Sequence, residues 1–135
     1  MNSRTHYHLN NQQKDNVLAL PARERYQHFV GRVADWERLW VLADAEDNLF
    51  IRTASSVQYL PVWPHPDYAV DIACLVDLNL IASEVDLYDF MNNWLPGLDT
   101  DNVKVGIFPD LEGNTWIMEP RDLLEALESE CEKYE

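Results

Sequence analysis

The sequence is poor in glycine and cysteine, and it contains no long hydrophobic run. Four glycines leave little scope for a phosphate-binding loop, and no Walker A, GxGxxG, GxSxG, HExxH or CxxC motif occurs. Cys74 and Cys131 form no CxxC pair, so we expect both to be small buried residues with reduced thiols. No segment approaches the roughly 18 apolar residues of a membrane span, and the polar residues 1–16 do not resemble a signal peptide.

Lysine and arginine are absent between Arg52 and Lys104. The same segment carries eight carboxylates, and we call them the acidic block: Asp67, Asp71, Asp77, Glu84, Asp86, Asp89, Asp99 and Asp101. Residues 1–35 have a net charge of +2 and residues 36–135 a net charge of −16, which gives −14 in total. One interpretation of this charge is solubility alone. The other is a field that attracts a basic partner.

The charge also excludes classes of partner. A field of this sign repels nucleic-acid backbones and anionic membranes, so we expect neither as a partner. We expect a basic protein partner and a cytoplasmic location. The exposed aromatic residues are also compatible with a homodimer.

The length and composition are typical of one folded domain. Among 135 residues, 47% are hydrophobic and fifteen are aromatic, which is enough to form a core without disulfides or structural metal. Residues 1–16 are polar and lack periodicity, so we expect a mobile N-terminal arm followed by a single acidic domain over residues 17–135.

Hydrophobic periodicity predicts an alternation of helices and strands. Helices are expected over residues 21–34, 67–76, 86–95 and from Pro120 onward, and strands over 36–43, 49–53, 57–62, 78–83, 103–107 and 115–118. Pro96 is expected to end the third helix, and a strand is an alternative for 66–76 because that run is short. Polar turns are expected at 45–48 and 109–114, so we expect two hairpins, one of strands 36–43 and 49–53 and one of strands 103–107 and 115–118. The fold class is therefore α+β, with a mixed, mostly antiparallel sheet of about five or six strands and three or four helices packed on it.

A segment with three prolines in six residues suggests a binding surface. Pro61, Pro64 and Pro66 restrict the backbone around Trp63 and His65, next to Asp67 and Tyr68. A rigid rim of Trp63, His65, Asp67 and Tyr68 would offer amphipathic anchors to a partner. Alternatively, Trp63 fills the core at the point where the strand ends and the helix begins.

No catalytic constellation can be recognised, so we assign no catalytic residue, metal ligand or cofactor. Residues 99–102 resemble the start of an EF-hand loop, but Val103 and Lys104 stand where an oxygen ligand and a glycine are required. The alternative to a binding protein is a small-ligand or metal-assisted enzyme that uses His65 and nearby carboxylates.

Several motifs are similar to those of the bacterial family catalogued as domain of unknown function 2750. The resemblance spans roughly residues 20–130 and depends on Arg25-Tyr26, Phe29, Trp40, Leu60-Pro61-Val62-Trp63-Pro64, Ala69, Phe90, Trp94-Leu95-Pro96, Val103-Lys104-Val105, Phe108-Pro109 and the leucine-rich C-terminal segment. It implies no activity and no site residues. More faintly, the order of elements resembles SseB-like and immunity-type acidic domains, which bind proteins. We therefore expect a non-catalytic protein-binding module, of an adaptor or immunity-like kind.

Overall fold

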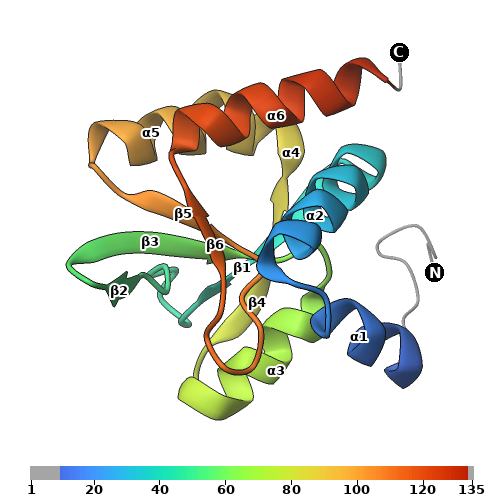
Figure 1. The fold of residues 1–135 in the computed structure, drawn as a ribbon. Coiled ribbons are helices and arrows are strands. Elements are labelled where there is room, and N and C mark those ends of the chain that lie inside the picture. The colour runs from blue at the N-terminus through green and yellow to red at the C-terminus, as the bar shows by residue number, and fades with distance from the viewer. Residues whose placement is uncertain (1–9, 134–135) are drawn as a thin grey trace, which may run out of the picture.

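Six strands form two sheets in the part of the chain that the computed structural model describes, residues 10–133 (Figure 1). Strands β1 (Arg38–Ala43) and β4 (Ile81–Asp86) make an antiparallel pair. The second sheet has the order β2-β3-β5-β6, with β2 at Arg52–Ala54, β3 at Val57–Val62, β5 at Lys104–Ile107 and β6 at Trp116–Met118. Only β3 and β5 run parallel in this sheet. The predicted α+β class with a mixed, mostly antiparallel sheet is confirmed.

The helices surround these strands. They are α1 (Asn11–Leu18), α2 (Ala22–Trp36), α3 (Pro66–Val76), α4 (Leu87–Asp89), the π-helical segment η2 (Phe90–Trp94), α5 (Leu95–Thr100) and α6 (Pro120–Glu132). Helix α6 packs against α2 and α5 at one end of the molecule, whereas α3 packs against β1 and β4 at the opposite end (Figure 1). The segment for which a strand was the alternative is therefore a helix. None of the helices in residues 10–133 is long and apolar enough to cross a membrane.

The expected end of the helix at Pro96 is wrong. The helical backbone begins after Asp86, whose carboxylate accepts the Asp89 N–H, and continues through η2 to Thr100. Pro96 lies in the first turn of α5, where the ring fits without breaking the chain. The π turn that precedes it places the Leu95 N–H on the Phe90 carbonyl, so the backbone is paired just before the proline. A proline next to a π turn therefore interrupts the regular hydrogen-bond pattern without ending the helix.

The first predicted hairpin forms only beside its turn. The strands expected at 36–43 and 49–53 share an isolated antiparallel bridge between Ala43 and Leu49 and a hydrogen bond from the Phe50 N–H to the Leu42 carbonyl. The main partner of β1 is β4, which begins three residues later than the strand predicted at 78–83. The second predicted hairpin, β5 with β6, is confirmed. Hydrophobic periodicity identified the strands. It does not determine which strands pair, because pairing depends on which apolar faces meet.

Residues 11–18 form helix α1, although this stretch was expected to belong to an arm without regular structure. Its cap explains why a polar sequence becomes helical here. The Asn10 side chain accepts the Gln13 N–H at 2.8 Å, and the Gln13 side chain accepts the Asn10 N–H at 3.1 Å. The Lys14 ammonium lies 2.6 Å from the Asp71 carboxylate, which ties α1 to α3. Residues 1–9 of the expected arm lie outside the described residues.

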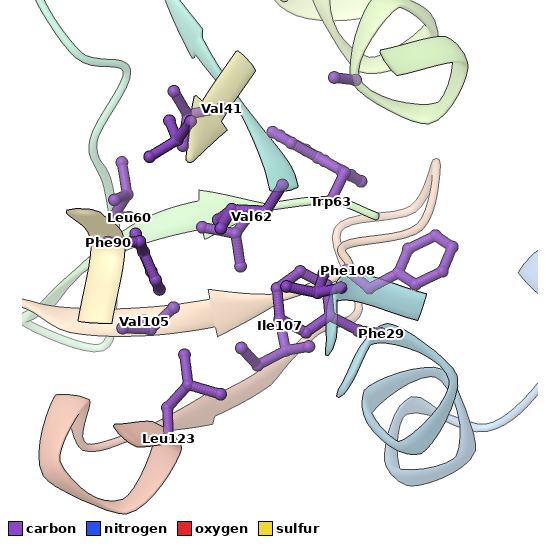
Figure 2. Packing of buried hydrophobic residues seen from close by; sticks show 14 of the residues in the cluster. Phe29, Val41, Leu60, Val62, Trp63, Phe90, Val105, Ile107, Phe108 and Leu123 are labelled. Atoms are coloured by element: carbon purple, nitrogen blue, oxygen red, sulfur yellow. The ribbon is translucent and has the colours of Figure 1, made fainter. Parts of the chain in front are cut away.

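The hydrophobic core is centred on the parallel pair β3–β5. Leu60 lies opposite Val105 and Val62 opposite Ile107, and all four side chains are fully buried. Figure 2 shows these residues with Phe29 from α2, Leu123 from α6 and Trp63 at the end of β3. Hydrogen bonds of 2.9 Å in both directions between the backbones of Trp40 and Trp63 join the two sheets. The core therefore runs from the α5–α6 end through β3 to α3.

Candidate protein-binding surface

Trp63, the first residue of the predicted rim, belongs to the core. Its side chain is 0% exposed and its indole Nε1 donates to the Pro109 carbonyl at 3.2 Å. That bond satisfies the polar atom of a buried indole. The alternative interpretation, in which Trp63 fills the space where strand gives way to helix, describes its position in the structure (Figure 2).

His65 is the N-cap of α3. Its Nδ1 accepts the Asp67 N–H at 3.1 Å, and Pro66 occupies the first turn of the helix. A nitrogen that accepts an N–H carries no proton, so the 3.7 Å approach of Nδ1 to the Asp67 carboxylate is not an ion pair in this arrangement. The side chain is 1% exposed, which leaves little of it for contact with a substrate or partner.

Tyr68 is buried behind the cap. Its ring lies 4.6 Å from the ring of Phe108 and 6.2 Å from that of His65. Burial raises the pKa of its hydroxyl to about 12, so the side chain is neutral at physiological pH. Its hydroxyl has no hydrogen-bond partner among residues 10–133. A neutral phenol held among apolar rings has a packing role.

Asp67 is the member of the predicted rim that is open to solvent. Its side chain is half exposed in the first turn of α3, where a carboxylate favours the positive end of the helix dipole. The structure therefore brings Trp63, His65 and Tyr68 together in the interior and leaves Asp67 outside. Partner binding at this segment remains a prediction. Of the four predicted rim residues, Asp67 is the one exposed enough to contact a partner.

The acidic block continues from Asp67 along α3, β4 and the helices that follow. Seven of its eight members are exposed, and Asp71 is partly covered by Lys14. Glu84 approaches Arg38 at 3.7 Å and Asp99 approaches Arg121 at 3.1 Å. Exposed pairs of this kind contribute little to stability, so the carboxylates are available to a competing cation or basic side chain.

Four exposed apolar side chains follow one another at the end of α3 and the start of β4. We call Leu75, Val76, Leu78 and Ile81 the α3–β4 corner; they are 65, 45, 79 and 54% exposed. A tight turn, in which the Leu80 N–H donates to the Asp77 carbonyl, joins the two elements. Single exposed leucines are ordinary, but four within seven residues form a local apolar patch. Asp71, Asp77 and Glu84 lie near it in the sequence.

This corner was not predicted from the sequence. Cys74 was expected to be buried, but it is exposed because it lies on the outer face of α3, while Ile72 and Ala73 face the core. A run of five apolar residues in a helix must turn some of them away from the core, since one face alone is covered. Which of these apolar residues are exposed depends on the packing of α3, and no pattern in the sequence indicated it.

Two other aspartates stabilise the turns in which they lie. Asp44 and Asp110 each accept two backbone N–H groups at 2.9–3.0 Å within the chain segments 44–48 and 110–114. In the part of the chain that the structure describes, no group of three or more His, Cys, Asp or Glu residues is arranged to hold a metal ion. These turns therefore have a structural role that their sequences explain.

The fold and surface define an α+β domain with an acidic exterior. Within that class, residues 26–127 match the family described as protein of unknown function (DUF2750). The chain therefore belongs to this family, and the match includes the motifs around Trp63 and Trp94. A search of curated proteins finds no match. The fainter resemblance to SseB-like and immunity-type domains remains a prediction.

Proposed function

We propose that this chain is a non-catalytic, cytoplasmic protein-binding module, and that it binds a basic partner through the α3–β4 corner and the carboxylates near it. The observation that carries the proposal is the combination of an exposed apolar patch with like-signed charge. Leu78 is 79% exposed, and residues 53–103 supply carboxylates with no lysine or arginine. Protein interfaces commonly combine an apolar centre with a polar rim.

The charge determines which partner fits. Arg38 and Lys14 are the basic residues that approach Glu84 and Asp71 in the structure, and both pairs are partly exposed. A partner with lysine or arginine around an apolar centre would complement this surface. Electrostatic steering would then raise the association rate and make it depend on salt.

The alternative enzyme that uses His65 draws no support from this geometry. His65 Nδ1 accepts a backbone N–H at the start of α3, and the imidazole is 1% exposed. A general base needs to reach the proton that it removes. His65 Nδ1 is used as a helix cap, so the binding proposal fits the structure better.

The test is affinity capture from a lysate of the source organism, followed by direct binding of the identified partner. We expect one basic protein to be retained by the wild type, with weaker retention as ionic strength rises from about 0.05 M to about 0.5 M. Leu78→Ser should reduce the affinity, whereas Leu111→Ser, which alters a half-exposed leucine outside this corner, should not.

A second pair of variants tests the charge. Asp77→Asn with Glu84→Gln should weaken binding and flatten its salt dependence, because two carboxylates near the corner are removed. Glu125→Gln with Glu128→Gln on α6 makes the same change in net charge at another place and should leave binding unchanged. Equal losses in both double variants, or recovery of the same background proteins at every salt concentration, would contradict the proposal.

A further inference from the structure

The outer edge of β4 has no strand partner among residues 10–133. The pairing of β1 shows which backbone groups lie on that edge. Trp40 exchanges hydrogen bonds with Trp63, and Leu42 accepts the Phe50 N–H, so the backbones of Trp40 and Leu42 face away from β4. Backbone groups alternate in direction along an antiparallel strand.

The register then assigns the outward groups of β4. Glu84 lies opposite Trp40 and Ala82 opposite Leu42, and these are pairs without hydrogen bonds between β1 and β4. The N–H and C=O groups of Ala82 and Glu84 therefore point outward, while those of Ser83 and Val85 bond to β1. This edge can receive another strand, since its free groups are spaced as a strand requires.

We propose that the partner binds by adding an extended, basic segment to the outer edge of β4. This inference rests on the proposed function and specifies its binding mode. Main-chain bonds to Ala82 and Glu84 would provide affinity, and the side chains of the added strand would provide specificity. The α3–β4 corner adjoins this edge, because Ile81 is both its last member and the first residue of β4.

The side chains of β4 indicate the sequence of the added segment. Successive side chains alternate between faces, so Ala82, Glu84 and Asp86 share one face and Ile81, Ser83 and Val85 share the other. Glu84 and Asp86 are exposed, and Ile81 is 54% exposed. A strand in which lysine or arginine alternates with valine or isoleucine places opposite charges together on one face and apolar groups together on the other.

A second copy of this chain is a poorer occupant than such a segment. It would bring the same carboxylates, Glu84 and Asp86, and a net charge of −14 to the edge. Charged side chains on an edge strand are a common protection against self-pairing. The Arg38–Glu84 contact of 3.7 Å neutralises Glu84 only in part, because both side chains are partly exposed.

Amide hydrogen exchange of the ¹⁵N-labelled chain tests the proposal with a defined probe. In the free protein, Ser83 and Val85 should exchange slowly and Ala82 and Glu84 quickly. The probe is an acetylated peptide of about ten residues with alternating lysine and valine. Its addition should slow exchange at Ala82 and Glu84 at least about tenfold, whereas a peptide with glutamate in place of lysine should not.

Ala82→Pro separates strand addition from attraction by charge alone. It removes an outward N–H and leaves the β1 pairing in place, which an edge strand tolerates. The variant should bind the lysine–valine peptide at least about tenfold more weakly at an unchanged melting temperature. The control Ala82→Thr keeps the N–H group and should bind as the wild type does.

The outcomes distinguish the two proposals. If the identified partner or the peptide binds Ala82→Pro and the wild type equally, strand addition is wrong and the protein-binding proposal stands. Slow exchange at Ala82 and Glu84 in the free protein that disappears on dilution would show that a second copy occupies the edge, and it would overturn the inference. If Ala82→Pro unfolds, unchanged exchange of the wild-type amides on peptide addition still refutes it.

Discussion

Two turns of the molecule share one sequence pattern but lie in different surroundings. Residues 44–48 read Asp-Ala-Glu-Asp-Asn and residues 110–114 read Asp-Leu-Glu-Gly-Asn. In each, the first aspartate accepts the N–H groups of the glutamate and the asparagine, and its own N–H donates to the carbonyl of the asparagine at 3.0 Å. The fourth residue has positive φ in both, 65° at Asp47 and 87° at Gly113.

Arg25 distinguishes the second turn from the first. Its guanidinium is 2% exposed and donates to the carbonyls of Leu20, Phe108 and Asn114 at 2.5, 3.0 and 2.8 Å. The Asp110 carboxylate lies 3.8 Å from it. Burial lowers the pKa of Arg25, and the charge of Asp110 opposes that change. The local pattern therefore specifies the turn, and the buried arginine attaches only one of the two turns to the rest of the fold.

The largest expected effect is the loss of that attachment. Arg25→Met removes the side-chain donor of three carbonyls, of which, among residues 10–133, only that of Asn114 still accepts a backbone N–H, from Asp110. It also removes a contact that holds Phe108 at a φ of 52°, which a bulky residue rarely adopts. We expect the free energy of unfolding to fall by about 3–5 kcal/mol in urea titrations. Arg23→Met on the exposed side of α2 should change it by about 0.5 kcal/mol or less. Equal losses in the two variants would show that Arg25 is not an anchor.

A smaller effect on stability should distinguish Asp110 from Asp44. Asp110→Ala removes two backbone hydrogen bonds and one from the Asn114 side chain within the turn, together with the charge facing Arg25. We expect a loss of about 1–3 kcal/mol in the same assay. Asp44→Ala removes the equivalent bonds from an exposed turn and should destabilise the chain less. A greater loss from Asp44→Ala would show that the arginine contributes nothing to the difference.

The comparison also shows what could be predicted from the sequence. Helix α2 and the β5–β6 hairpin were predicted because each is determined by residues close together in the sequence. In each, apolar residues repeat with the period of a helix or a strand, and turn residues mark the ends. Both aspartate-rich turns were recognisable for the same reason. Arg25 was named only within a family motif, because its three carbonyl acceptors come from residues 20, 108 and 114, which only the folded chain brings together.

The candidate site could be predicted less well. Trp63, His65 and Tyr68 carry groups suited to recognition, yet each has a buried role: a core side chain, a helix cap and a ring packed on Phe108. The α3–β4 corner shows the reverse, since its four apolar side chains are exposed, as is the neighbouring Cys74, which was expected inside. Residue type limits the roles of a side chain, and the packing of α3 on β1 and β4 decides between inside and outside.

The next expected effect is a pH dependence of the first turn. Hydrogen bonds from the backbone and side chain of Asn48 and from the backbone of Glu46 lower the pKa of Asp44. A carboxyl with a lowered pKa in the folded state stabilises the fold above its unfolded pKa, and this contribution is lost as the pH falls through the folded value. The stability difference between the wild type and Asp44→Asn should therefore shrink in acid. A difference that is constant across that range would contradict this assignment.

The smallest expected effect concerns the fourth residue of each turn. Asp47→Gly relieves a left-handed conformation that costs an L-residue free energy, but it also makes the unfolded chain more flexible, so we expect a gain of only about 0.5 kcal/mol. Gly113→Asp should lose about the same amount, since aspartate tolerates this region better than most residues. Thermal unfolding of both single variants measures the two changes. A much larger loss from Gly113→Asp than the gain from Asp47→Gly would show that the turn beside Arg25 is less tolerant of strain than its exposed counterpart, and that the anchor stiffens the turn as well as attaching it.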